Sequence, residues 1–235
     1  INKEIQSYSE SMFLGLSMLL MLVVDHNNWN NAYTLLGFAA LLVLFCAGAW
    51  PRERFRLDVK TVGFYPVVLF GSMFLAVLFS YEPSASFRFL LYHIAAALCV
   101  LVTVSAVRGT EDLKRLAAGG GVCVLASSLY GVYQRIQGVE VNESYVDMTV
   151  NAGMPGRVES YFDNPNTFAE VLILLLPLVL ALILCSKRPI SRLAACGTFA
   201  VGLIALGMTY SRASWVGGAC AMVVLVFLWK PKLLP

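Results

Sequence analysis

The chain has 235 residues, of which 59% are hydrophobic and only 13% are charged, and its net charge is +3. A soluble globular domain is about half apolar and about a quarter charged. The composition therefore excludes an ordinary soluble domain and indicates a protein whose surface mostly faces lipid.

Long apolar runs follow one another along the chain. A bilayer core of about 30 Å requires roughly 20 apolar residues in a helix, and no alternating pattern favours strands. We therefore expect an all-α polytopic bundle, with residues 1–235 forming a single transmembrane domain. About eight spans are predicted, near residues 9–25, 32–50, 61–80, 87–107, 116–136, 165–185, 193–210 and 213–229.

Basic residues occupy alternate connections between these spans. Because cytoplasmic loops collect Lys and Arg, this alternation places both ends of the chain in the cytoplasm. The residues concerned are Arg52, Arg54, Arg56 and Lys60, then Arg108, Lys114 and Arg115, then Lys187, Arg188 and Arg192, and finally Lys230 and Lys232.

The opposite, outer side is polar and moderately acidic, and it includes a long loop at about residues 137–164. Loops of this length are often functional, and this one is apolar enough that we expect it to fold back over the outer mouth of the bundle. Four arginines lie on this side against the usual preference: Arg88, Arg135, Arg157 and Arg212.

Local signals define the two ends of this outer region. Asn164 suits a helix N-cap and Pro165 the first helical position, so a helix N-terminus, a natural anion site, faces outward. Arg212 falls in the short turn between the last two spans, where a cation close to the membrane usually marks a site. Small residues at helical spacing around it, such as Ser214 and Gly218, predict close helix packing.

Two segments carry a family resemblance. Residues 157–170 read RVESYFDNPNTFAE and precede LILLLPL, and residues 209–213 read TYSRA one crossing later. In order, spacing and topology, this pair resembles the O-antigen ligase/O-antigen polymerase superfamily. The match covers roughly the second half of the chain.

The resemblance implies a membrane-embedded glycosyltransferase with an inverting, metal-independent mechanism and no cofactor. Its donor would be a glycan on a polyprenyl diphosphate, and its acceptor a hydroxyl on a lipid- or protein-linked carrier. The enzyme would lie in the bacterial cell membrane with its active face extracytoplasmic. Arg212 and Arg157 would be catalytic. The expected substrate-binding residues are Asn164, Asn166, Ser211, Tyr210 and Glu170, with Arg88 and Arg135 added by topology alone.

Some positions depart from the family pattern. Asp163 stands where many relatives have Gly, and neither His26 nor His93 is assigned as a general base, which we expect beyond residue 235 in a longer protein. The six cysteines lie in or beside apolar runs without CxxC spacing, so no metal site is predicted.

A flippase or transporter of lipid-linked saccharide and a non-catalytic membrane scaffold remain alternatives. The first should contain inverted repeats, and the second leaves the paired motifs unexplained.

Overall fold

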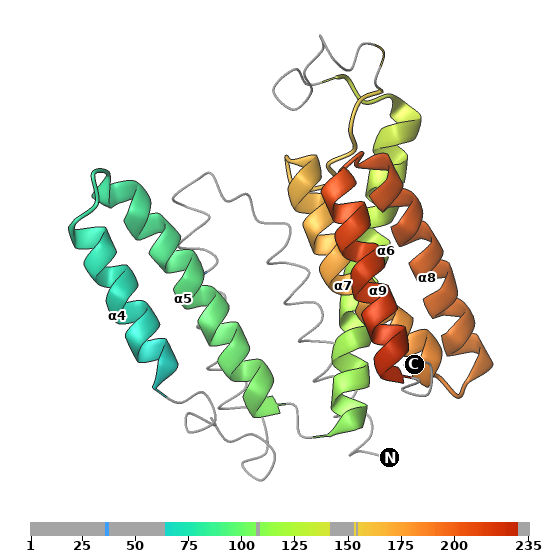
Figure 1. Ribbon diagram of the computed structural model, residues 1–235, viewed down its shortest axis with the longest axis horizontal. Helices are drawn as coiled ribbons and strands as arrows, with labels where there is room; N and C mark the ends of the chain where they lie inside the picture. The colour runs from blue at the N-terminus through green and yellow to red at the C-terminus, as the bar shows by residue number, and fades with distance from the viewer. Residues whose placement is uncertain (1–35, 38–63, 107–108, 142–152, 154, 230–235) are drawn as a thin grey trace. The chain divides into compact units, whose positions relative to one another are not determined.

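The computed structural model describes residues 36–37, 64–106, 109–141, 153 and 155–229. Within these residues all regular secondary structure is helical (Figure 1). Apart from residues 36–37, which are helical, the expected spans 9–25 and 32–50 lie outside the described residues, as does His26. The helices are α4 (Tyr65–Leu78), α5 (Pro83–Ala106), α6 (Thr110–Gln137), α7 (Pro165–Cys185), α8 (Pro189–Met208) and α9 (Arg212–Trp229).

The chain divides into two compact units. In one unit, α4 and α5 pack as an antiparallel hairpin, with Val77, Leu90, Leu91 and Ala95 buried. The hydroxyls of Ser80 and Ser86 lie 2.7 Å apart across the turn. The prediction of a single transmembrane domain stays a prediction.

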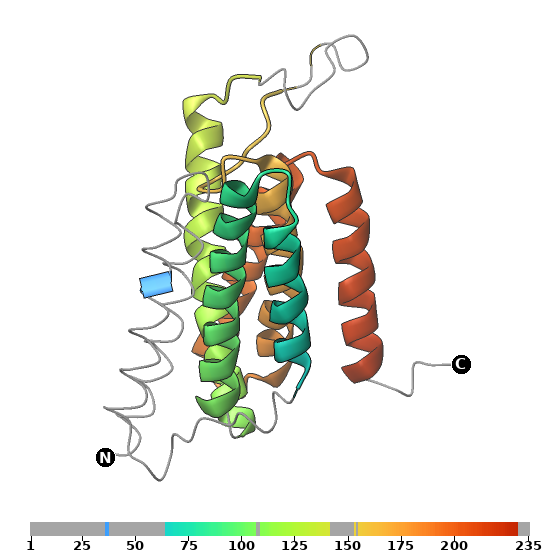
Figure 2. The same ribbon diagram turned by 90° about the vertical axis from the view of Figure 1, so that its left-hand side faces the viewer.

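The other unit contains α6 to α9, and α7 is its central helix. It packs against both α8 and α9, and its buried side chains repeat at helical spacing: Phe168, Ala169, Leu172, Leu176 and Val179. Figures 1 and 2 show that α6 extends beyond the ends of its neighbours on the side where residues 155–164 lie.

Glycines set the helix crossings in this unit. A Cβ on Gly202 of α8 would lie 2.7 Å from Leu176 Cδ2 and 2.9 Å from Val124 Cγ1, and one on Gly218 of α9 would lie 3.1 Å from Ile173 Cγ2. Small residues let helices approach closely where lipid provides no hydrophobic driving force between them. The predicted packing role is therefore confirmed for Ser214 and Gly218, which are buried, and Gly202 has the same role on α8, whereas Ala213 and Gly217 are exposed.

Four helices among the described residues, α6 to α9, are long and apolar enough to cross a membrane. Exposed apolar side chains such as Leu174 and Leu228, 72% and 76% exposed, would face lipid. By contrast, α4 has 14 residues. At about 1.5 Å per residue it extends about 21 Å, which is shorter than the crossing predicted for residues 61–80.

Several helices begin earlier than the apolar runs do. A hydropathy window omits polar first turns, but Pro83 and Pro189 suit the first helical position, and Glu111 and Asp112 favour the positive end of α6. As a result, Lys114, Arg115 and Arg192 lie within helices rather than in the loops where we expected them.

Candidate functional site

The N-terminus of α7 has the predicted cap. The Asn164 side chain accepts a hydrogen bond from the backbone N–H of Asn166 at 2.8 Å, and Pro165 is the first residue of the helix. This arrangement satisfies one of the N–H groups that every helix start leaves unpaired. The cap therefore fixes where the FDNPN segment turns into the helix.

The TYSR segment forms the tight connection between α8 and α9. The Thr209 hydroxyl donates to Leu206 O at 2.7 Å, and the hydroxyls of Ser211 and Ser214 lie 2.9 Å apart. The Trp215 indole N–H also donates to Leu206 O, at 2.9 Å. Arg212 is the exposed first residue of α9, not a turn residue as expected, because α9 begins directly after Ser211.

Arg157 joins these two segments. Its Nε donates to Thr209 O at 2.8 Å, and its Nη2 donates to Asn166 Oδ1 at 2.5 Å. The next residue adds a backbone bond, from Val158 N–H to Met208 O at 3.2 Å. The end of α8 and the start of α7 are thus connected through the loop that precedes α7.

The same loop is also fixed to α6. The Gln134 amide accepts from Ser160 N–H at 2.8 Å and donates to Ser160 O at 3.1 Å, and the Ser160 hydroxyl donates to Ser127 O at 2.8 Å. Arg135 Nη1 donates to Gly156 O at 3.1 Å. The last part of the long loop, residues 155–164, therefore packs against the ends of α6, α7 and α8.

Two close contacts seat this segment. Val158 is fully buried, and a Cβ added to Gly131 of α6 would lie 2.9 Å from Val158 Cγ1. A Cβ on Gly156 would lie 2.1 Å from Val139 O and 2.9 Å from Glu140 O. Both glycines are needed because their neighbours occupy the space that a side chain would fill.

Backbone strain gathers in the two motif segments. Among the described residues, the non-glycine residues with a left-handed backbone are Ser160, Asp163 and Tyr210, with φ of 58°, 50° and 52°. Such conformations cost free energy and cluster at functional sites. They also explain the departure at Asp163, because glycine adopts this region readily and Asp is one of the residues that tolerates it.

Burial shifts two ionisable groups in the segment. Burial lowers the pKa of Arg157, although arginine keeps its charge in proteins. Burial, and secondarily the nearby Asp163 carboxylate, raises the pKa of Glu159 above its ordinary value of 4.5. Burial of Glu159 in the docked segment disfavours its ionised form, so docking is favoured while the Glu159 carboxyl group is protonated.

We therefore expect docking of residues 155–164 to weaken as pH rises. The docked state binds the Glu159 proton more tightly, so this contribution is fully present below pH 4.5 and is lost as pH passes through the raised pKa. Glu159→Gln should remove the dependence. Amide hydrogen exchange of residues 157–160 between pH 4 and 8, corrected for intrinsic rates, measures it. Glu170→Gln is the control, and equal pH profiles for wild type and Glu159→Gln would contradict the prediction.

The remaining expected residues are not among those that these hydrogen bonds join. Glu170 is exposed in the second turn of α7, and Arg88 lies in the second turn of α5, in the other unit. His93, also in α5, donates from Nδ1 to Phe89 O at 2.7 Å, which satisfies one ring nitrogen within its own helix. Among the described residues, no cluster of metal-binding side chains occurs.

Sequence reasoning missed two members of the network. Gln134 clamps the backbone of Ser160, and the only signal for it is an amide beside Arg135 at the end of an apolar helix. Gly156 is the other, and its close approach to Val139 depends on a non-local contact for which the sequence carries no signal.

Neither a protein-family model nor a curated protein nor a solved structure matches the chain.

Proposed function

We propose that the protein transfers a glycan from a polyprenyl-diphosphate donor to a hydroxyl acceptor on the outer face of the bacterial cell membrane, as an O-antigen ligase or polysaccharide polymerase does. One observation carries this proposal. The two segments on which the family resemblance rests are joined through Arg157, and Arg212 is exposed beside that junction.

The Arg212 guanidinium is the group at this end of the α6–α9 unit that suits an anionic ligand. Both α7 and α9 begin at this end and α6 and α8 finish here, so the helix dipoles largely offset one another, and the local cation is the Arg212 guanidinium at the positive start of α9. A diphosphate is a multiply charged anion whose oxygens suit the paired donors of arginine. We assign Arg212 to the diphosphate, with Asn164, Tyr210 and Ser211 lining its surroundings.

The proposed chemistry is an inverting displacement. The acceptor hydroxyl oxygen attacks the anomeric carbon and forms a new C–O bond, while the bond to the diphosphate oxygen breaks and its electron pair leaves with the diphosphate. The hydroxyl proton passes to a general base, which we do not assign to any described residue. Arg212 stabilises the charge that develops on the leaving oxygen, and fixed cations do this well in a partly dry site.

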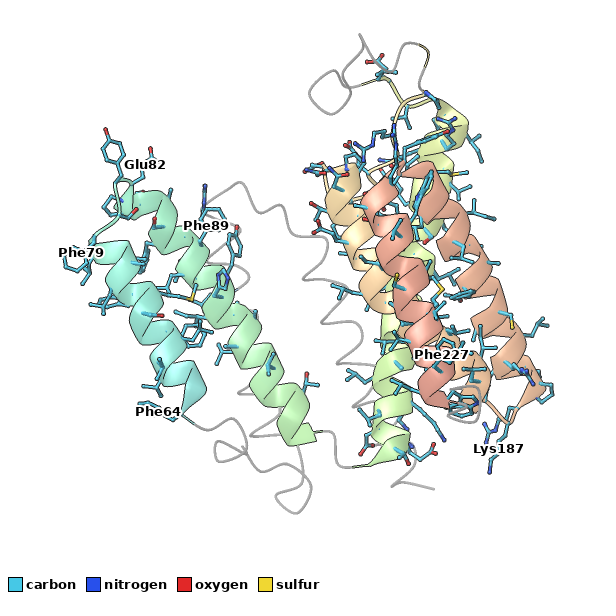
Figure 3. The ribbon with its side chains drawn as sticks, viewed as in Figure 1. Phe64, Phe79, Glu82, Phe89, Lys187 and Phe227 are labelled. Carbon is cyan, nitrogen blue, oxygen red and sulfur yellow. The ribbon has the colours of Figure 1, made fainter. Side chains whose placement is uncertain are left out.

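The proposed topology has about eight spans, with both ends of the chain in the cytoplasm. Alternate basic connections support it, including Lys187 and Arg188 between α7 and α8. Figure 3 shows Lys187 at the opposite end of this unit from the 155–164 segment. This orientation leaves the Arg212 end facing outward, where a flipped lipid-linked donor is available.

The test is transfer by the purified protein. The protein in lipid nanodiscs is mixed with an undecaprenyl-diphosphate glycan and a lipid-linked acceptor extracted from the producing cell. Mass spectrometry then follows formation of the joined glycan and release of undecaprenyl diphosphate. Absence of both products contradicts the proposal. Donor translocation in sealed vesicles without transfer would instead favour a flippase.

A further inference from the structure

We propose that Arg157 is a positioning residue, which holds the connection between α8 and α9 (residues 209–211) in place instead of binding the diphosphate itself. The inference rests on the proposed function, and it changes the role that the family pattern implies for this arginine. It concerns how the site is held in the conformation that binds the donor.

The donors of Arg157 carry the argument. Bidentate binding of a phosphate uses two neighbouring N–H groups of the guanidinium plane. In Arg157 the Nε and Nη2 groups form one such pair, and they donate to two different acceptors, Thr209 O and Asn166 Oδ1. This edge of the fork therefore connects two parts of the protein, and its two N–H groups do not donate to the oxygens of a phosphate at the same time.

The acceptors identify what is held. Thr209 is the C-cap of α8 and lies three residues before Arg212, and the intervening Tyr210 has a left-handed backbone. Asn166 is the second residue of α7, next to the cap. Arg157 thus fixes the conformation of the turn from which α9 starts. Because Arg212 is the first residue of α9, its direction depends on this turn.

The side chain chemistry requires arginine at this position. The planar guanidinium can donate to two acceptors in fixed directions, whereas the lysine ammonium is a point charge on a flexible stem. A catalytic group misplaced by about 1 Å loses about 100-fold in rate. We therefore expect Arg157→Lys and Arg157→Ala to lower kcat by about 10- to 100-fold, with the KM for the donor changed by less than about threefold.

Double variants separate positioning from direct contact. If Arg157 acts through Arg212, adding Arg157→Ala to Arg212→Lys causes little further loss, because residues that act as a unit are not additive. Asn166→Ala removes one acceptor and leaves the Asn164 cap intact, so it should reproduce part of the kcat loss. The positioning role would be overturned if the rate loss of the double variant equalled the product of the two single losses. A rise in the KM for the donor without a fall in kcat would also overturn it.

A second measurement needs no activity. Trp215 donates to Leu206 O, and its ring lies 6.5 Å from that of Tyr210. In a protein with Trp29, Trp50 and Trp229 changed to Phe, Trp215 is the sole fluorophore for the turn. We expect Arg157→Ala and Arg157→Lys to increase its quenching by acrylamide without substrate.

The control is Arg192→Ala, an exposed arginine in the first turn of α8, at the other end of that helix from Thr209. Unchanged Trp215 quenching in both Arg157 variants would overturn the inference even if transfer is measured. Conversely, if the wild-type protein transfers no glycan, the proposed function is contradicted. The quenching result still decides whether Arg157 holds the turn. If Arg157→Ala does not fold, Arg157→Lys and Asn166→Ala provide the same comparison.

Discussion

Replacing Arg212 by alanine should lower the rate of glycan transfer by about 100- to 1000-fold, the loss typical for one preorganised group that stabilises developing charge. The side chain is exposed at the start of α9, so its removal leaves no buried cavity. The protein should therefore still insert and accumulate. The measurement is initial transfer rate in nanodiscs, with protein amount determined by gel densitometry.

Two further variants make this result specific. Arg212→Lys should also fall well short of wild type, because an ammonium keeps the charge but not the paired donors. Arg192→Ala removes another exposed arginine, at the other end of the unit, and should transfer at the wild-type rate. An Arg212→Ala enzyme with full activity would end the catalytic assignment.

A single methyl group at Gly156 should have an effect of similar size. Alanine there would place Cβ 2.1 Å from Val139 O and 2.7 Å from the carbonyl carbon, and these are backbone atoms that cannot rotate away. Gly156→Ala should therefore displace residues 155–164 from α6 and weaken the bonds of Arg157. We expect transfer to fall by at least about 100-fold, since small displacements of a catalytic group have effects of that order.

The readout of Gly156→Ala is structural as well as kinetic. Amide exchange of residues 157–160 should increase, while exchange in the middle of α7 stays as in wild type. The matched control is Gly207→Ala, near the same end of the unit, because a Cβ there meets nothing within 4 Å. Wild-type exchange and transfer in Gly156→Ala would show that the close contact with Val139 is not required.

The sequence was sufficient to predict features that depend on local chemistry. The start of α7 follows from the cap at Asn164 and from Pro165, and it is confirmed to the residue. The helical class and four spanning helices follow from apolar length. The predicted span that corresponds to α6 begins at residue 116, whereas the helix begins at Thr110. The first turns of α6 are polar, and helix formation there depends on hydrogen bonds and not on hydropathy.

The network around Arg157 could not be predicted in the same way. Its bond to Thr209 spans 52 residues of chain, and the clamp between Gln134 and Ser160 spans 26. No spacing rule connects residues so far apart. The sequence indicated Arg157 because of its place in a motif, but its bonding partners depend on how α6, α7 and α8 pack.

The buried position of Val158 has a consequence for the maturation of the protein. Its side chain lies against Gly131 of α6, and its backbone N–H donates to Met208 O of α8. The position that Val158 occupies therefore does not form until these helices have come together. Membrane helices insert individually and associate afterwards. The 155–164 segment therefore docks only after these helices have associated, and a freshly inserted chain has its apolar helices before it has the hydrogen bonds around Arg157. The proposed glycan transfer should therefore begin only after α6, α7 and α8 have associated, and newly inserted protein should be inactive until then.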